Sequence, residues 1–212
     1  GAGTELKDSV AIGYNAAAAS TTAGRFVAIG HGALGTGVGT ATTSYNVAIG
    51  YDSLKAITSG TDNIGIGVDT LKAADAEDNN IAIGSGAMSG AINGAEQNIA
   101  IGNTSLDALT SGDSNTAVGY ATLGANTTGS NNTALGKSAL AANTTADNNV
   151  AVGHSALLSN TTGTRNIAIG TDAYHGSDTE NDNMAIGYQA MVTNTAGGTG
   201  NVAVGNYALD AL

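Results

Sequence analysis

The sequence predicts an all-β fold, a parallel β-solenoid of about twelve stacked coils that forms a single repetitive domain over residues 1–212. Three observations predict it: a short motif recurs at a nearly fixed interval, apolar residues alternate within the motif, and turn-forming residues separate its copies. Aromatic residues make up only 4% of the chain, and Trp, Pro and Cys are absent. The core must therefore be built from Ala, Val, Ile and Leu.

The motif is Asn-[Val/Ile/Thr/Met]-Ala-[Ile/Val/Leu]-Gly, and most copies lie 17 residues apart, with single intervals of 20 and 18 and a final one of 18. Solenoids carry such repeats because each coil packs only on its neighbours. The extra residues of the longer intervals, within residues 35–45 and before Asn98 and Asn201, are therefore expected in loops that project from the rod. Because the chain opens and closes inside the repeat pattern, we expect it to be part of a longer fibrous protein. The closing glycines are Gly13, Gly30, Gly50, Gly67, Gly84, Gly102, Gly119, Gly136, Gly153, Gly170, Gly187 and Gly205.

Within each copy the alternation predicts one short strand. Val150 and Val152 share one face, Ala151 the other. We expect the two valines to face the coil interior, together with Leu157, which follows the glycine by four residues. The odd spacing between Val152 and Leu157 predicts a turn at the glycine and a second strand beyond it. Asn- and Thr-rich segments such as residues 143–148 predict the remaining turns.

Two further columns repeat with the motif. Asn opens ten of the twelve copies, which predicts a ladder of side-chain amides along the stack. The central position never carries a side chain larger than methyl, so we expect that face to pack against another copy of the chain, giving a trimer. Packing against the coil's own second strand, which would leave a monomer, is the alternative. The small residues are Ala48, Gly65, Ala82, Ala100, Ala117, Ala134, Ala151, Ala168, Ala185 and Ala203.

The charge balance limits the partners. The chain carries 17 acidic and 6 basic residues, a net charge of −11. Because such a surface repels phosphate backbones and anionic lipids, nucleic acid and membrane insertion are not expected for this segment. No stretch of 18 apolar residues occurs.

Units such as residues 46–50 (Asn-Val-Ala-Ile-Gly) resemble the head repeats of YadA-like trimeric autotransporter adhesins. Residues 132–145 are also similar to repeats of phage-type tail-fibre proteins. The adhesin repeat is usually about 14 residues long, compared with 17 here. The resemblance implies a left-handed parallel β-roll, a homotrimer, and an extracellular location on a bacterial cell surface or a phage virion. It also implies a structural and adhesive role in attachment to a host or matrix, through an unknown glycan or protein receptor.

The residue after each motif glycine varies from coil to coil, which indicates a surface column. We predict that this column forms the recognition surface; its candidate residues are Tyr14, His31, Tyr51, Tyr120, Lys137, His154 and Tyr188.

No enzyme activity, cofactor or metal is predicted. Some β-helical transferases use a histidine, but their hexapeptide turns do not fit a 17-residue repeat, so catalysis by His31, His154 or His175 is not expected. The acidic segments 77–79 and 180–182, with Asp113 and Asp147, could offer oxygen ligands to calcium. They lack the calcium-binding β-roll pattern, so solvated turns are expected.

Two other functional classes remain open. Thr127-Thr128, Thr144-Thr145 and Thr161-Thr162 recur at the 17-residue interval, and regular threonine arrays on flat solenoids can bind ice. A β-helical enzyme is the other alternative, although no cleft of convergent acids and bases is evident in so uniform a repeat.

Overall fold

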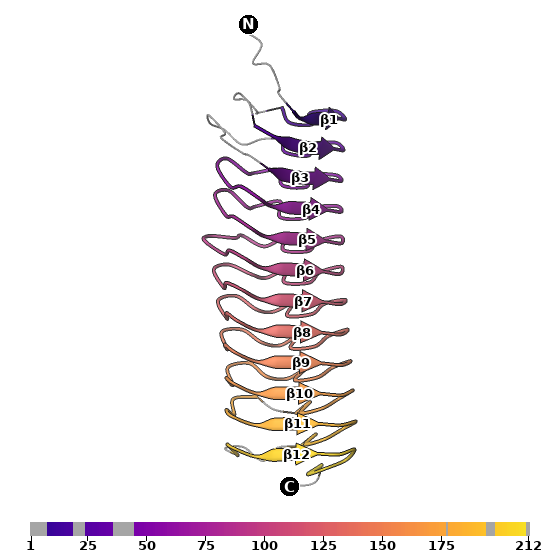
Figure 1. Ribbon diagram of the computed structural model, residues 1–212, viewed down its shortest axis with the longest axis vertical. Helices are drawn as coiled ribbons and strands as arrows, with labels where there is room; N and C mark the ends of the chain where they lie inside the picture. Colours follow the sequence, from indigo (N-terminus) through magenta and orange to yellow (C-terminus); the bar gives the residue numbers. More distant parts are fainter. Residues whose placement is uncertain (1–7, 19–23, 36–44, 177, 194–197, 211–212) are drawn as a thin grey trace, which may run out of the picture.

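A computed structural model shows one twelve-stranded parallel sheet, in which strands follow one another in sequence order along a rod (Figure 1). It describes residues 8–18, 24–35, 45–176, 178–193 and 198–210. No helix occurs in these ranges, and a parallel β-solenoid is confirmed. The strands are β1 (Val10–Ile12), β2 (Phe26–Ile29), β3 (Asn46–Ile49), β4 (Ile64–Ile66), β5 (Ile81–Ile83), β6 (Ile99–Ile101), β7 (Thr116–Val118), β8 (Thr133–Leu135), β9 (Val150–Val152), β10 (Ile167–Ile169), β11 (Met184–Ile186) and β12 (Val202–Val204).

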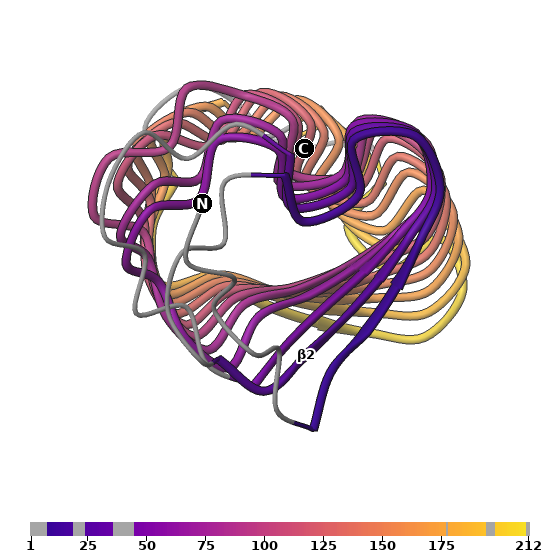
Figure 2. The same cartoon turned by 90° about the horizontal axis from the view of Figure 1, so that it is seen from above.

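Every strand pairs in the register set by the motif. Ala151 of β9 lies opposite Ala168 of β10, at the 17-residue interval. The longer coils keep the same register, because Ala28 pairs with Ala48 and Ala82 with Ala100. The extra residues of those coils therefore lie outside the strands. Seen along the rod, the coils nearly superpose, with a gradual twist (Figure 2).

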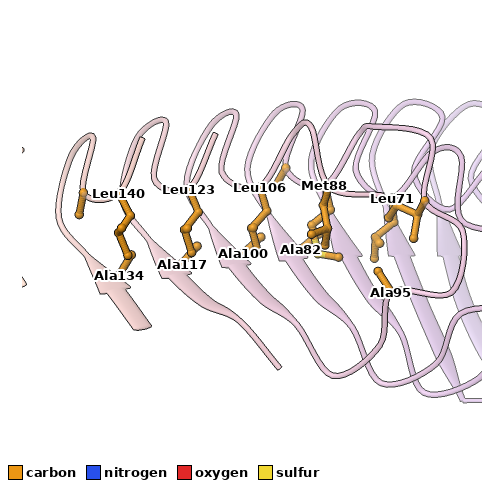
Figure 3. Packing of buried hydrophobic residues seen from close by; sticks show 14 of the residues in the cluster. Leu71, Ala82, Met88, Ala95, Ala100, Leu106, Ala117, Leu123, Ala134 and Leu140 are labelled. Atoms are coloured by element: carbon orange, nitrogen blue, oxygen red, sulfur yellow. The ribbon is translucent and has the colours of Figure 1, made fainter. Parts of the chain in front are cut away.

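The expected facing of the strands is wrong. Ala134 and Ala151 are fully buried, whereas Val150 and Val152 are only partly buried and lie on the opposite, outward face. The same holds one coil on, where Ile169 is exposed. The interior is a thin layer in which the buried leucines and alanines form one cluster, and Leu140 and Ala134 are two of its members (Figure 3). A methyl group fills the space that the leucine leaves, and a valine would not fit.

The leucine column faces inward as expected, but no second strand carries it. Leu140 and Leu157 have φ of 51° and 52°, in the left-handed region, and the segment after each glycine is a series of turns. This conformation costs an ordinary residue about 1–2 kcal/mol. Hydrogen bonds between coils compensate: the N–H of Leu140 donates to the carbonyl of Ala156 at 3.0 Å, and that of Leu157 to Ala173 at 3.0 Å.

The asparagine ladder is confirmed. Asn132 Oδ1 accepts the backbone N–H of Asn149 at 3.0 Å, and Asn132 Nδ2 donates to the carbonyl of Ala146 at 2.8 Å. The side chain thus joins the strand to the turn of the next coil and to the next asparagine. Because the nine amides from Asn46 to Asn183 are buried and hydrogen-bonded, the column stabilises the stack in the middle of the protein.

The motif glycine is required by its conformation and by its neighbours. Gly136 has φ of 133°, and a Cβ there would lie 2.5 Å from the carbonyl oxygen of Gly153 in the next coil. Gly65 has another reason, since it replaces alanine in the inward column where a Cβ would meet Ser53 Oγ at 2.6 Å. Ser53 and Thr70 form a buried hydroxyl pair at 2.8 Å there.

The loop predictions are tested only in part. The extra residues between Gly30 and Gly50, expected within 35–45, and the loop before Asn201 lie largely outside the described residues. The longer coil before Asn98 is described: Ala91, Asn93 and Gly94 are exposed, and nothing lies within 4 Å of a Cβ placed on Gly94. That loop projects from the rod as predicted.

Candidate interaction surface

The outward face of the sheet consists of two parallel rows of side chains, which we call the apolar face. Row one contains Val10, Val27, Val47, Ile64, Ile81, Ile99, Thr116, Thr133, Val150, Ile167, Met184 and Val202. Row two contains Ile12, Ile29, Ile49, Ile66, Ile83, Ile101, Val118, Leu135, Val152, Ile169, Ile186 and Val204. None of these side chains carries a charge, and all but the two threonines are apolar.

The side chains of the apolar face shield one another along the rod without being covered from outside. In the middle of the sheet Ile101 and Leu135 are each 37% exposed, and at the last strand Val204 is 66% exposed. With coils about 4.8 Å apart, the face is about 55 Å long, and its area is on the order of 500 Å². Such a continuous patch lies at the upper end of what a monomer exposes, which makes this face a candidate interaction site.

The post-glycine column lies at the corner where each strand ends, next to row two. The structure confirms that its predicted residues are on the surface. Tyr14 is the most exposed of them at 73%, and the others are exposed as well: His31, Tyr51, Tyr120, Lys137, His154 and Tyr188. The column therefore borders the apolar face along the whole rod.

Three members of this column contact one another. The ring of His31 stacks between Tyr14 and Tyr51, with centroids 5.3 and 5.0 Å away. His31 Nδ1 lies 3.9 Å from Asp52 Oδ1, and Asp52 Oδ2 accepts a hydrogen bond from Lys55 Nζ at 2.7 Å. The hydrogen bond to Asp52 raises the pKa of Lys55.

The histidines are not brought together. His154 lies seven coils from His31 and shares only its distance to an aspartate, with Nδ1 3.9 Å from Asp172 Oδ1. His175 lies in the turn after Tyr174, where its carbonyl accepts the N–H of Ser159. The three imidazoles therefore do not form one site.

The sequence did not indicate a hollow of about 290 Å³ beside the N-terminal part of row one. Val27 and Val47 line it together with Arg25 and Tyr45. Arg25 Nη1 donates to the Tyr45 hydroxyl at 2.9 Å, and its guanidinium lies 5.8 Å from the ring centroid. The sequence signal that could have indicated this hollow is the presence of two long side chains, Arg25 and Tyr45, at the same repeat position in successive coils.

The acidic turns differ from expectation at two glutamates. Glu77 and Glu180 are buried rather than solvated. Glu77 Oε2 accepts the N–H groups of Asp75 and Ala76, and its Oε1 accepts that of Gly94 at 3.0 Å. The carboxylate thus satisfies turn N–H groups, a role that Asn126 serves by accepting the N–H of Gly129. Among the described residues, no three His, Asp or Glu side chains cluster as metal ligands.

The threonine pairs are divided between two roles. Thr127, Thr144 and Thr161 are half-buried, and each hydroxyl donates to a carbonyl of the next coil at 3.0 to 3.2 Å. Thr128, Thr145 and Thr162 are exposed. Only the second set, one residue per coil over three coils, presents a regular hydroxyl array to solvent.

Comparisons with known proteins give no neighbour. No family model matches the chain, and neither curated proteins nor solved structures include a match. Within the described ranges, no helix is long and apolar enough to cross a membrane.

Proposed function

We propose that the chain is a structural and adhesive segment of a trimeric surface fibre that attaches to a host or matrix. The observation that supports this proposal is the apolar face, which extends over all twelve strands and is polar only at Thr116 and Thr133. The small-residue column cannot serve as the contact between chains, because its alanines are buried within the coil.

A second copy of this chain is the occupant that fits the apolar face. The partner must present an equally long, uncharged surface that repeats at the same spacing, and a copy has both properties. The area per chain, on the order of 500 Å² for the two rows alone, approaches the ~800 Å² that each partner contributes to a standard interface. Three copies would bury their apolar faces around a common axis and leave the acidic turns in solvent.

The post-glycine column would then border the contact between copies and remain accessible for attachment. It supplies aromatic, basic and imidazole side chains on a rigid support, which are groups that recognise glycans and proteins. The sheet gives stiffness because each coil hydrogen-bonds to both neighbours.

The assembly is tested with a variant of the apolar face. Ile99→Gln with Ile101→Gln places two polar side chains in the middle of the face, and native mass spectrometry should show that trimer is lost. Thr128→Gln with Thr145→Gln changes the exposed turns and serves as the control that remains trimeric. If both variants assemble like the parent, the apolar face is not the contact.

The adhesive part is tested separately on a panel of immobilised glycans and matrix proteins. Binding by the parent should be weakened in the triple variant Tyr120→Ser, Lys137→Ser, His154→Ser, whose side chains are exposed and do not contribute to the core. An unchanged binding profile would remove the column from recognition.

The ice-binding alternative has some support in the exposed column of Thr128, Thr145 and Thr162. It is the weaker proposal because the neighbouring hydroxyls are engaged by backbone carbonyls. A thermal hysteresis measurement on the parent decides it, with Thr145→Leu as the matched variant.

A further inference from the structure

The apolar face has one polar interruption, at Thr116 and Thr133. These residues occupy row one in β7 and β8 and pair directly across the ladder. Both are partly buried by their neighbours, and both lie on the outward side of the strand. Neither hydroxyl has a hydrogen-bond partner within the described part of the chain, so both are available to a partner on the apolar face.

The other residues of the apolar face do not distinguish one coil from the next. The strands keep one register whether a coil has 17, 18 or 20 residues, as the pairs Ala151–Ala168, Ala82–Ala100 and Ala28–Ala48 show. The face therefore repeats every coil, about 4.8 Å. If two copies slid past each other by a whole coil, apolar side chains would again meet apolar side chains, and only the end coils would lose contact.

We propose that Thr116 and Thr133 fix the axial register between copies of the chain. The inference rests on the proposed assembly through the apolar face. When copies are aligned, the two threonines of one chain meet those of the next, and each hydroxyl can donate one hydrogen bond and accept another. When copies are shifted by two coils, both hydroxyls face isoleucine or valine and are buried without a partner, which is unfavourable.

Threonine suits this role because it does not disturb the strand. It is β-branched like the valines and isoleucines of row one, so it fits the pleated surface equally well. It differs by a single hydroxyl, and a single polar group in an apolar contact is known to select register in helical assemblies. The pair lies near the middle of the sheet, so a shift by one coil places one threonine of each chain against an apolar residue, and a shift by two coils places both there.

The absence of native cysteine makes the register measurable. Two single-cysteine chains are prepared, Val118→Cys and Val152→Cys, which place thiols two coils apart in row two. That separation, about 9.6 Å along the rod, exceeds what a disulfide spans, since its Cα atoms lie within about 7 Å. The chains are mixed, unfolded, refolded together and oxidised, and the disulfides are identified by mass spectrometry.

Aligned copies give only disulfides between identical positions. The same two single-cysteine chains, each also carrying Thr116→Val and Thr133→Val, should instead form mixed disulfides between positions 118 and 152. The yield of these mixed disulfides should be at least tenfold higher than in the chains that keep both threonines. The control Thr116→Ser, Thr133→Ser keeps the hydroxyls and should keep the aligned pattern. Circular dichroism checks that all chains fold.

Two outcomes overturn the inference, and they differ. If the valine pair still gives only identical-position disulfides in an intact assembly, the threonines do not set the register, although the apolar face remains the contact. If the parent sediments as a monomer and the single-cysteine chains form no disulfides with one another, the assembly itself is absent, and the proposed function fails first.

Discussion

Asn132 accepts the backbone N–H of Asn149, one coil further along, through its side-chain oxygen at 3.0 Å. The same side chain donates to Asn115 Oδ1 at 3.1 Å and to the carbonyl of Ala146 at 2.8 Å. One buried amide therefore joins three successive coils. The ladder holds the stack together where the thin alanine and leucine core offers little area.

Replacing Asn132 should be strongly destabilising. Asn132→Ala leaves the N–H of Asn149 buried without its acceptor, at a cost of about 1–3 kcal/mol. It also removes one of the two hydrogen bonds to the carbonyl of Ala146, which keeps the one from Asn143 Nδ2. Thermal unfolding followed by circular dichroism should show a clear decrease in Tm. Thr145→Ala, an exposed turn residue in the following segment, should unfold like the parent. Equal Tm values for all three proteins would contradict the ladder's contribution.

The facing of the strand can be tested with two neighbouring residues. Ala151→Leu adds three carbon atoms to a filled interior and should destabilise the fold by about 1–3 kcal/mol or more. Val152→Asp lies on the outward face, so it should leave the coil folded while preventing assembly. Urea unfolding of both variants, with sedimentation of the second, checks this. A folded, stable Ala151→Leu beside an unfolded Val152→Asp would restore the facing first expected from sequence.

Two glycines separate the effect of close approach from that of backbone conformation. Gly136 and Gly94 both have positive φ, 133° and 89°, but only Gly136 faces a carbonyl at 2.5 Å from an added Cβ. Gly136→Ala should therefore lower the Tm clearly more than Gly94→Ala does. If the two substitutions lower the Tm equally, close packing between coils is not the reason that glycine is required in the motif.

The acid dependence of stability should include a contribution from Asp182. Its carboxylate accepts two hydrogen bonds from the Arg165 guanidinium, at 2.6 and 2.8 Å, and this lowers the pKa of Asp182. A lowered pKa in the folded state means that the pair stabilises the fold above the carboxylate's ordinary value, about 4, and that this is lost as the pH falls below it. The Tm of the parent should exceed that of Asp182→Asn at neutral pH, and the difference should shrink as the pH falls below the ordinary carboxylate pKa of about 4. A difference that grows on acidification would contradict this sign. The effect should be small because the pair is exposed.

The repeat interval was enough to predict the solenoid, since a 17-residue recurrence with alternation and turn residues leaves few other folds. The asparagine ladder followed from the same recurrence, because equal residues stack in a parallel array. The direction of Val150 and Ala151 could not be obtained this way. Alternation shows that the two faces of the strand differ, but it does not show which face is buried. Large residues usually lie inside, but here the interior is only one leucine thick, and the small residues face it.

The left-handed leucines were also beyond the pattern. Leu140 reads as a strand residue by composition, and its φ of 51° is compensated by hydrogen bonds between coils that only the stacked structure reveals. The post-glycine column was predicted because its residues vary from coil to coil. The sequence analysis placed the residues of the apolar face inside the coil, and only the structure shows that they are on the surface.

The most direct test of the central claim, that the apolar face joins copies of this chain, is sedimentation equilibrium of the parent at neutral pH. We expect a single species with three times the 20.5 kDa mass of one chain. In the variant Ile99→Gln with Ile101→Gln, we expect the mass to shift towards that of one chain. A parent that sediments as a folded 20.5 kDa monomer at every concentration measured would contradict it.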